Sequence, residues 1–597
     1  MSLDHDEHDI PRELTILYAT ETGNAQDVAE RLARYCRRLH FSVRMFSIDE
    51  YSMSLKENII SEHLIIFVIA TAGSGREPRS MTPFWNMLLR SDLPHDLFDH
   101  LEFAVFGLGD SAYDKFCWPA KLLSRRLSSL GATEIVSRGE ADDQHHLGLD
   151  GALDPWIATL SGELLKLFPL PSGVEIAPDT IPEPRVSVID GTDSSSEPGL
   201  LYEIETDVYH TATIVCNKRI TAEDWYQDVR HLEFDFQDDI QYGPGDIAVI
   251  EPEVSAADVD AFLISMGWAN NADETFTIRH ALLDQSLPNR LPRTVALRTL
   301  FTKYLDFNAV PRRSFFALLR YFTTDDLEIE KLDEFLAPDG AEELYDYCYS
   351  VRRTIREVLE EFRSAKIPRE YLFDLFPPVR PREFSIASSV HKHARKIQLC
   401  VAIVNYRTKL KIPRKGVATT YLAALHPGDQ VSIRIKKGLI TLPEDVSTPV
   451  ICVGPGTGIA PMRAVIEERI LLDAKENTLY QGCRSASKDK HYHQDFSGYA
   501  AGGHLDYRVA SSRDGPPGVK RTYVQDLINE DAEHIWELIG EKGAWVYISG
   551  SSNKMPAGVK LAIQGAAEKF GGKSEGEAKE FVAAMEKEGK LIEDCWD

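Results

Sequence analysis

Short apolar runs that end in glycine- or hydroxyl-rich turns mark the first 160 residues of the chain. The runs are Leu14–Ala19, Leu64–Thr71 and Phe103–Gly109, and an amphipathic stretch, Asn24–Arg38, follows the first of them. Apolar runs of this length that alternate with helical stretches are typical of parallel strands buried on both faces. We therefore expect residues 13–165 to form a doubly wound α/β domain, a fold that binds ligands at the carboxyl ends of its strands.

After the first domain, the pattern of apolar and polar residues changes several times along the chain. Closely spaced prolines and the polar run 192–198 indicate a linker after the first domain. Runs such as Val229–Phe236 and Ile397–Val404 favour antiparallel strands around a helical region, and strand–helix alternation returns at Val450–Val453. The predicted order is a disordered acidic tail (1–12), the α/β domain (13–165), a linker (166–205), an antiparallel β-barrel (206–253 and 376–445) interrupted by a helical insertion (254–375), and a second doubly wound domain (446–597).

Three turns of the first domain carry residues suited to a planar ligand with a phosphate group. Thr20–Ala25 follows the first strand and opens a helix, where unpaired N–H groups and hydroxyls can hold a phosphate. Thr71–Gly75 and Gly107–Tyr113 end two later strands; their glycines let the backbone approach a ring, and Tyr113 can stack on its face. An ordinary helix N-cap also explains the first turn taken alone. Three such turns at one edge of a sheet indicate a site for such a ligand far more specifically than any one of them does.

These turns resemble those of the FMN domain of the diflavin reductases, the cytochrome P450 reductase family. Gly107–Phe116 and Asp142–His145 are most similar to the cytosolic members. The resemblance covers nearly the whole chain and implies a flavodoxin-like domain, an FAD-binding barrel, a ferredoxin–NADP reductase-like domain, and FMN, FAD and NADPH as cofactors. The residues that it assigns to FMN are Thr20, Glu21, Thr22, Gly23, Asn24, Ala25, Thr71, Ala72, Gly73, Ser74, Gly75, Leu108, Gly109, Asp110, Tyr113 and Asp142.

Two segments of the predicted barrel resemble the family's FAD-binding sequences. In Arg380–Ser389 the resemblance implies that Arg382 holds the pyrophosphate. It also implies that Phe384 packs on the flavin ring and that Ser385 hydrogen-bonds near the reactive nitrogen of this ring. Gly416–Thr420 resembles a second phosphate loop, and Leu300–Phe316 resembles a connecting region that we interpret as structural. An edge strand with one arginine in a salt bridge is the alternative for the first segment. The residues assigned to FAD are Arg382, Glu383, Phe384, Ser385, Gly416, Val417, Ala418, Thr419 and Trp596.

The last domain carries a dinucleotide loop and a cluster of cations. Gly454–Pro461 follows an apolar run and opens a helix, as in ferredoxin–NADP reductases. Ser512, Arg513 and Arg521 suit the 2′-phosphate of NADPH, because two guanidinium groups and a hydroxyl can neutralise that anion. The family usually has lysine at the position of Arg521, and solvated surface charge is the alternative interpretation. The residues assigned to NADPH are Gly456, Thr457, Gly458, Cys483, Arg484, Ser512, Arg513, Arg521, Tyr523 and Gln525.

The final residues, Asp594–Asp597, would ordinarily be a fraying tail. The resemblance instead implies that Trp596 stacks on FAD and that Asp594, with Ser385, belongs to the catalytic cluster for hydride transfer. Where many relatives have Cys-Gly-Asp, this chain has Ser549–Ser551. Either hydride transfer is slower here or Ser549 substitutes for the cysteine.

The composition restricts the partners of this chain. Its formal net charge is −27, which argues against nucleic-acid binding and against docking on anionic lipid. No apolar run reaches the roughly 20 residues of a membrane span, and the eight cysteines form no CxxC pair. We therefore expect a cytoplasmic monomer with reduced thiols. No metal site is expected, because His145–His146 lacks a second pair of ligands.

The expected acceptor of electrons is a protein with a basic surface. Acidic residues lie in or beside the FMN turns, namely Glu21, Glu77, Asp110, Asp114 and Asp142. Resemblance to the cytosolic members implies an iron–sulfur acceptor of the anamorsin type, in cytosolic iron–sulfur protein assembly. Three alternatives stay open: a reductase for cytochrome P450 or another haem acceptor such as sulfite reductase, a flavin-bound regulatory scaffold with vestigial catalysis, and an FMN carrier fused to an inert domain.

Overall fold

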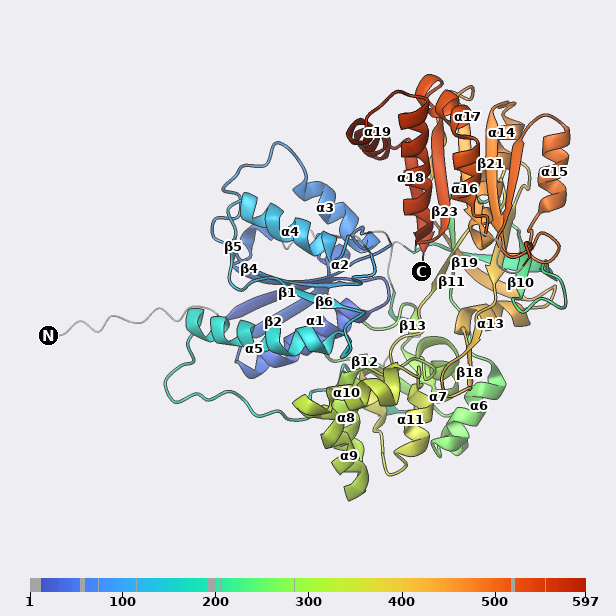
Figure 1. Ribbon diagram of the computed structural model, residues 1–597. Helices are drawn as coiled ribbons and strands as arrows, with labels where there is room; N and C mark the ends of the chain where they lie inside the picture. The colour runs from blue at the N-terminus through green and yellow to red at the C-terminus, as the bar shows by residue number, and fades with distance from the viewer. Residues whose placement is uncertain are drawn as a thin grey trace. The chain divides into compact units, whose positions relative to one another are not determined.

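The computed structural model shows two compact units, drawn in Figure 1. The first comprises Met1–Glu203 and Ala257–Pro378, and the second comprises Ile204–Ala256 and Val379–Asp597. The structure describes residues 12–53, 59–73, 75–113, 115–191, 199–203, 207–283, 285–516, 521–552 and 554–596. The predicted acidic tail up to residue 11, and the residues Ser74, Asp114 and Asp597, lie outside these ranges.

The first unit contains the predicted doubly wound domain. Its parallel strands follow the order β2-β1-β3-β4-β5, with β6 paired to β4. The strands are β1 (Glu13–Ala19), β2 (Ser42–Ser47), β3 (Leu64–Ala70), β4 (Glu102–Gly109), β5 (Thr133–Glu134) and β6 (Gly139–Asp142). The helices are α1 (Asn24–Arg38), α2 (Ile48–Met53), α3 (Thr82–Leu88), α4 (Trp118–Ser129) and α5 (Asp150–Leu167). The fold class is confirmed for this part, and α1 has the predicted bounds.

Both faces of this sheet are covered, as the continuous apolar strands require. Ile16 packs in one core with residues of α1 and α5, whereas its neighbour Leu17 packs in the other core with residues of α3 and α4. Successive side chains of a strand point to opposite faces, so an apolar run without alternation needs a helical layer on each side. Figure 1 shows α1 and α5 on one side of the sheet and α3 and α4 on the other.

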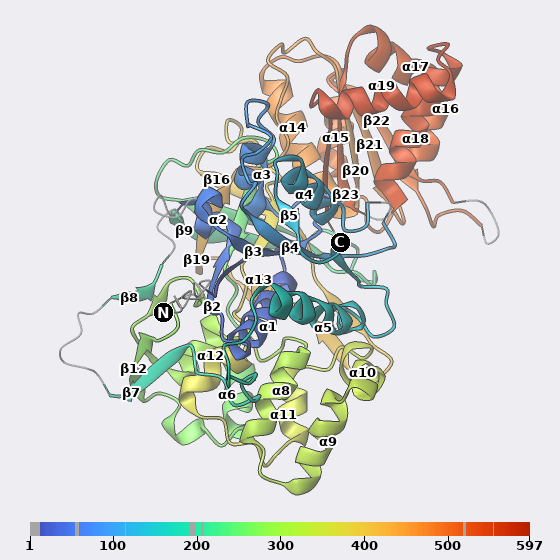
Figure 2. The same ribbon diagram turned by 90° about the vertical axis from the view of Figure 1, so that its left-hand side faces the viewer.

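The segment predicted to be a linker is partly built into this unit. It forms β7 (Val186–Asp190), which pairs with β12 (Thr275–His280) as Figure 2 shows, and β8 (Leu200–Tyr202), which pairs with β13 (Leu291–Pro292). Arg185 is buried and forms ion pairs with Glu30 of α1 at 2.6 Å and with Asp374 at 3.2 Å. The interpretation of this stretch as a linker is therefore wrong for its residues next to β7.

The insertion is mostly helical, as predicted, but β12 also pairs with β14 (Thr294–Ala296). Its helices are α6 (Ala256–Ser265), α7 (Leu297–Thr299), α8 (Arg313–Phe322), α9 (Asp326–Leu336), α10 (Ala341–Leu344), α11 (Ile355–Glu361) and α12 (Leu372–Leu375). Helix α11 begins at Ile355, because Thr354 caps it in a capping box with Glu357.

The second unit begins with a six-stranded antiparallel sheet of order β15-β11-β19-β9-β10-β16. Its strands are β9 (Tyr209–Arg219), β10 (Val229–Phe236), β11 (Ile247–Ile250), β15 (Arg382–Ser385), β16 (Lys396–Ala402) and β19 (Gln430–Lys436). A hairpin of β17 (Asn405–Arg407) and β18 (Pro413–Lys415) and the helix α13 (Val417–Ala424) precede the last of these strands. In the described residues a single bridge, Ile386–Leu399, joins the two edges of the sheet. The antiparallel arrangement is confirmed, but no complete ladder closes the predicted barrel.

The second doubly wound domain is confirmed, with the parallel order β22-β21-β20-β23-β24. Its strands are β20 (Val450–Pro455), β21 (Asn477–Cys483), β22 (Asp506–Ser511), β23 (Trp545–Ser551) and β24 (Leu591–Trp596). Its helices are α14 (Ile459–Leu471), α15 (His493–Ala501), α16 (Val524–Glu530), α17 (Ala532–Trp536), α18 (Lys554–Lys569) and α19 (Glu575–Lys587). The sequence did not reveal β24. Within the described ranges, no helix is both long and apolar enough to span a bilayer.

A buried ionic cluster joins α14 to the antiparallel sheet of the second unit. Arg463 donates to the Ala387 carbonyl and to Gln398 Oε1, each at 2.7 Å, and pairs with Glu467 at 2.9 Å. Lys392 pairs with Glu467 at 3.0 Å. Burial disfavours the charged carboxylate, but its cationic neighbours outweigh this and lower the pKa of Glu467 to about 2.

Replacing Glu467 with glutamine is expected to lower the free energy of unfolding of the second unit by about 3 kcal/mol, because the buried Arg463 then keeps only the partly exposed Asp495, at 3.4 Å, as an anionic partner among the described residues. Since the pKa of Glu467 is lowered in the fold, its contribution is complete above about pH 4.5 and is lost as the pH falls towards 2. Calorimetry over this pH range measures both effects. Asp473→Asn, which removes an exposed partner of Lys475, is the control and should leave Tm unchanged. An E467Q variant as stable as the wild type at pH 7 would contradict the argument.

Candidate functional site

The predicted FMN turns meet at the carboxyl edge of the first sheet. Gly23 caps α1 in a left-handed conformation, with φ at 91°, and its N–H donates to Thr20 Oγ1 at 2.8 Å. Glu21 Oε1 accepts from the Arg79 N–H at 2.8 Å, which ties the first turn to the segment after β3. The Thr71 N–H donates to the Leu108 carbonyl at 2.9 Å and so ties that segment to the end of β4.

Backbone hydrogen bonds tie the end of β6 to the turn that follows β4. Asp142 Oδ1 accepts from Ser111 at 2.9 Å and from Gln144 at 3.0 Å, and the Asp143 N–H donates to the Gly109 carbonyl at 2.9 Å. Partial desolvation opposes ionisation, but these hydrogen bonds prevail and lower the pKa of Asp142. Asp142 is therefore a carboxylate at neutral pH, and it lies at the same sheet edge as the three predicted FMN turns.

Local geometry at this edge fits a ligand with hydrogen-bonding groups. Thr71 Oγ1 is a buried hydroxyl without a hydrogen-bond partner in the described part of the chain. Gly75 has φ at 97°, and a Cβ there would lie 2.2 Å from Lys115 Cβ, so only glycine suits the position. The segment Ala72–Gly75 is also closed by a bridge from Ala72 to Arg76. Backbone and hydroxyl groups, which can hold a flavin and its phosphate, thus line this edge.

A residue that the sequence interpretation treated as structural reaches the first turn. Arg312, at the N-cap of α8, donates from Nη2 to Asn24 Oδ1 at 3.1 Å and to the Thr22 carbonyl at 3.4 Å. No sequence signal could reveal this contact, because about 290 positions separate the two partners.

The predicted FAD signature is the edge strand β15. Arg382 is exposed, and its guanidinium donates to the carbonyls of Arg380 and Pro381 at 2.9 and 3.3 Å. It has no carboxylate partner in the described residues, unlike the neighbouring Glu383, which pairs with Lys436 at 2.8 Å. The alternative of an edge arginine in a salt bridge is therefore not what the structure shows. Phe384 is half-buried against the core of the antiparallel sheet.

The predicted second phosphate loop opens the helix α13. Gly416 lies so close to Val404 and Thr419 that a Cβ would come within 2.9 Å of Val404 Cβ and 2.8 Å of Thr419 Oγ1. The Thr419 hydroxyl accepts from the Val404 N–H at 3.1 Å. Val417 and Ala418 form the first turn of the helix, where backbone N–H groups have no partner within the helix. The loop offers backbone donors to an anion, in agreement with its predicted role.

Two of the predicted catalytic residues are joined directly. Ser385 Oγ donates to Asp594 Oδ2 at 3.2 Å, which connects the end of β15 to the last strand, β24. Asp594 lies opposite Ser549 of β23 in the parallel register, and both residues are buried. Ser549 Oγ is a buried hydroxyl without a hydrogen-bond partner in the described residues. Trp596, two residues further along β24, is 38% exposed. Ser385 and Ser549 therefore both lie next to Asp594.

The predicted dinucleotide loop begins directly at the end of β20. A short turn, Gly456–Gly458, leads from the strand into α14, and Gly456 has φ at 58°. A Cβ at Gly458 would lie 2.0 Å from the Ser549 carbonyl oxygen, so the loop packs directly on β23. The N-terminus of α14 thus opens beside the predicted catalytic cluster, and its free N–H groups suit a pyrophosphate.

Arg513, one of the cations predicted for the 2′-phosphate, and Arg484 lie against a tyrosine that the sequence did not single out. Tyr226, in the turn between β9 and β10, is 65% exposed and accepts from Arg513 Nη1 at 3.3 Å. The guanidinium carbons of Arg484 and Arg513 lie 5.5 and 5.8 Å from its ring centre. The Ser512 N–H donates to the Cys483 carbonyl at 3.0 Å, which holds this strand end beside β21.

The remaining residues assigned to NADPH lie at the start of α16. Arg521 and Tyr523 are exposed there, and Gln525 belongs to the first turn of the helix. A Cβ at Gly482 would lie 3.2 Å from Val524 Cγ1, which places the start of α16 beside the end of β21. The structure therefore brings the start of α16, next to Arg521, to the same edge of the sheet as Arg513.

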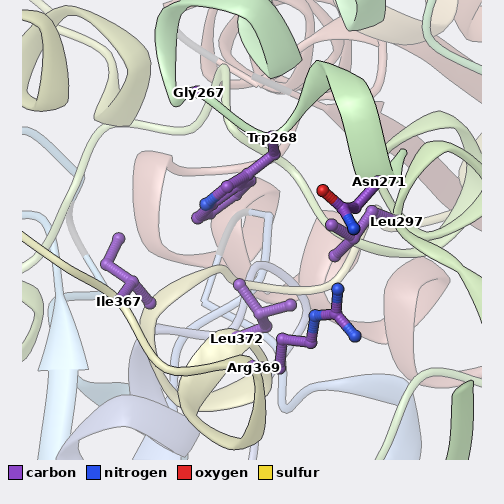
Figure 3. Close-up of a pocket in the computed structure, with 7 residues that line it drawn as sticks. All are labelled: Gly267, Trp268, Asn271, Leu297, Ile367, Arg369 and Leu372. Carbon is purple, nitrogen blue, oxygen red and sulfur yellow. The ribbon is translucent and has the colours of Figure 1, made fainter. Parts of the chain in front are cut away.

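A small cavity lies in the insertion. Its volume is about 90 Å³, and its lining residues are Gly267, Trp268, Asn271, Leu297, Ile367, Arg369 and Leu372. In Figure 3 the side chains of Trp268 and Leu372 line it, whereas Arg369 is already paired with Asp190 at 2.8 Å. None of the predicted site residues contributes to it.

Comparison with known proteins matches three family models in chain order. They are Flavodoxin at residues 16–156, FAD binding domain at 204–421, and Oxidoreductase NAD-binding domain at 452–560. Among the most similar relatives is NADPH-dependent diflavin oxidoreductase 1 of Xenopus laevis, 39% identical over 98% of this chain and 99% of that protein. The proteins of the same name from Danio rerio (39% identical, 97% and 99% covered) and Mycosarcoma maydis (38% identical, 98% of both covered) are similar over the same extent. The chain therefore belongs to the family of NADPH-dependent diflavin oxidoreductases.

Proposed function

We propose that this chain is a flavoprotein oxidoreductase that takes electrons from NADPH, passes them through FAD and FMN, and delivers them to an acceptor protein. The observation that carries the proposal is the hydrogen bond from Ser385 to Asp594, which brings the FAD signature to the last strand of the dinucleotide domain. When bound, FAD accepts two electrons as hydride and releases them singly, which suits one-electron acceptors. The order of the three family models supports the same path.

The roles predicted from the sequence are proposed for the residues as they stand. The turns at Thr20, Thr71 and Leu108, with Asp142, hold FMN; Ser74 belongs to this set but lies outside the described residues. Arg382 and the Gly416 loop hold the FAD pyrophosphate, because a guanidinium and free helix N–H groups both bind anions. Ser385 and Asp594 orient the reacting groups, and Ser549 supplies a hydroxyl beside them. Trp596 stacks on the ring of FAD.

NADPH is proposed to bind across the carboxyl edge of the last sheet. The Gly456–Gly458 turn holds the pyrophosphate, and Arg513, with Ser512 and Arg521, holds the 2′-phosphate. We propose the predicted domain limits, except for the linker residues next to β7, and a cytoplasmic location as well. The spans of the three family models support the domain limits.

The cofactor proposal is tested by releasing and quantifying the bound flavins and by titration with each nicotinamide nucleotide. Equimolar FMN and FAD, and reduction by NADPH but not by NADH, are the expected results. Only FMN in the released cofactor would favour the carrier fused to an inert domain. Failure to reduce ferricyanide or cytochrome c with NADPH would favour the regulatory scaffold.

We propose an iron–sulfur protein of the anamorsin type as the acceptor. The resemblance to cytosolic members of the family supports this choice. Purified partner, this protein and NADPH, mixed without air, should bleach the spectrum of the oxidised cluster. An unchanged cluster spectrum together with rapid reduction of a haem protein would instead favour a P450 or other haem reductase.

The rate of acceptor reduction should fall with rising salt concentration. Glu21 is exposed at the proposed FMN edge, and Asp110 and Asp142 are partly exposed there. An acidic docking face raises the association rate of a basic partner, and ions screen this attraction within about 8 Å at physiological ionic strength. We expect the second-order rate constant to fall about tenfold between 20 and 200 mM salt. Reduction of ferricyanide, an anion, is the control and should not fall. A salt-independent rate with the protein acceptor would contradict the proposed face.

A further inference from the structure

Arg312 differs from the other arginines of its helix in having no anionic partner. Arg313 pairs with Asp154 at 3.2 Å, and Arg320 forms a bidentate pair with Asp333. Arg312 instead donates from Nη2 to two neutral oxygens of the turn Thr20–Ala25. A guanidinium has five N–H donors. In the described part of the chain, its Nε and Nη1 hydrogens have no hydrogen-bond partner, and no carboxylate pairs with the group.

The turn that Arg312 contacts contains no cation of its own. Its residues are Thr, Glu, Thr, Gly, Asn and Ala, and the first turn of α1 adds the buried acid Asp27. A phosphate dianion placed there would face the dipole of α1 but also the charges of Glu21 and Asp27. The guanidinium of Arg312 donates to this turn from its side chain, whereas Arg79 donates to Glu21 through its backbone N–H.

The backbone around Arg312 is fastened to α1 and α5, so the side chain is held near the turn before any ligand arrives. Ser314 Oγ donates to Asp27 Oδ1 at 2.5 Å, one helical turn into α1. Arg313 reaches Asp154 of α5 and the carbonyl of Leu336. Arg312 itself is only partly exposed. A cation positioned by its neighbours loses little conformational freedom when it binds an anion.

We propose that Arg312, a residue of the insertion, supplies the cation that binds the phosphate of FMN. The inference rests on the proposed function, because it takes the turn Thr20–Ala25 as the phosphate site. The free N–H groups of the guanidinium provide charge-assisted hydrogen bonds that the turn cannot provide. The FMN site is then completed by a segment almost 300 residues away in sequence, and FMN binding depends on the insertion as well as on the flavodoxin-like domain.

The test compares FMN with riboflavin, which carries the same ring system without the phosphate. Full-length protein freed of flavin is titrated with each, and binding is followed by quenching of flavin fluorescence. We expect Arg312→Met to weaken FMN binding at least tenfold and riboflavin binding less than twofold. Arg312→Lys keeps the charge but loses the planar guanidinium group, and its FMN affinity should lie between those of the wild type and Arg312→Met. Arg320→Gln removes a cation from the same helix and should bind FMN like the wild type.

The outcomes separate the inference from the function on which it rests. Equal losses for FMN and riboflavin would mean that Arg312 only supports the shape of the turn, and no loss for either would mean that it does not act on the ligand; both results overturn the proposal. If R312M does not fold, as judged by circular dichroism, the salt dependence of the wild type decides: FMN affinity should fall with salt more steeply than riboflavin affinity, and equal slopes overturn the proposal. Wild-type protein that binds no FMN at all would reject the proposed function itself.

Discussion

Replacing Asp594 with asparagine is expected to slow the reduction of the protein's flavin by NADPH about a hundredfold, a loss of about 2.7 kcal/mol of transition-state stabilisation. Asp594 is buried, accepts a hydrogen bond from Ser385 and lies opposite Ser549. A carboxylate in so dry a place stabilises positive charge that develops beside it during hydride transfer, and water cannot replace it. Asparagine keeps the shape of the side chain but removes the charge.

Stopped-flow absorbance of the flavin measures this step directly. Glu593→Gln is the matched control, because Glu593 is an equally buried carboxylate one residue earlier that pairs with Lys560 at 2.7 Å instead. It should change the rate by less than threefold. Ser385→Ala, which removes the hydrogen bond but keeps the charge, should slow the step about tenfold. A D594N variant with the rate of the wild type would remove Asp594 from the proposed catalytic cluster.

Replacing Arg513 with alanine is expected to raise the KM for NADPH about a hundredfold and to change the KM for NADH less than threefold. Arg513 and Arg484 face Tyr226, and neither has a carboxylate partner in the described residues. Arg508, five residues earlier, is paired with Asp531 at 2.8 Å. A charge-assisted hydrogen bond to a phosphate contributes about 1.5–3 kcal/mol. The preference for NADPH over NADH should therefore nearly vanish.

Steady-state kinetics with both nucleotides measure this preference. Arg508→Gln, which removes a cation from β22, the strand that leads to Arg513, is the control and should keep this preference. Tyr226→Leu tests the tyrosine that the structure adds to the site, and we expect about a fivefold higher KM for NADPH because the ring supports Arg513. Equal losses with NADPH and NADH in R513A would place Arg513 outside the 2′-phosphate site.

Sequence reasoning predicted best the elements whose signal is local. The bounds of α1 and β10 follow from apolar periodicity, and the turns at Thr20 and Gly456 lie at the strand ends where the pattern puts them. The strand β24 was missed, because two buried acids, Glu593 and Asp594, interrupt its apolar residues. Such a strand is stabilised by pairing with β23, a partner about 45 residues away, and not by its own pattern.

The parts of the site that the sequence did not reveal come from distant segments. Tyr226 lies in a turn of the antiparallel sheet, and Arg312 begins a helix of the insertion, yet each reaches a loop of another domain. The prolines near β7 correctly indicated irregular backbone, but nothing local showed that Arg185 would pair with Glu30 and Asp374. Long-range contacts of this kind leave no periodic trace in the chain.

The interrupted layout of the two units has a consequence for how the chain acquires its fold during translation. The first unit needs residues up to Pro378, so a fragment that stops at Glu203 lacks Asp374, the partner of Arg185. Strand β11 leaves the ribosome long before either of its neighbours, β15 and β19. Its apolar residues, Ile247–Ile250, stay unpaired while well over a hundred further residues are synthesised. A nascent chain stalled within the insertion would therefore present an open strand edge to chaperones and to other chains.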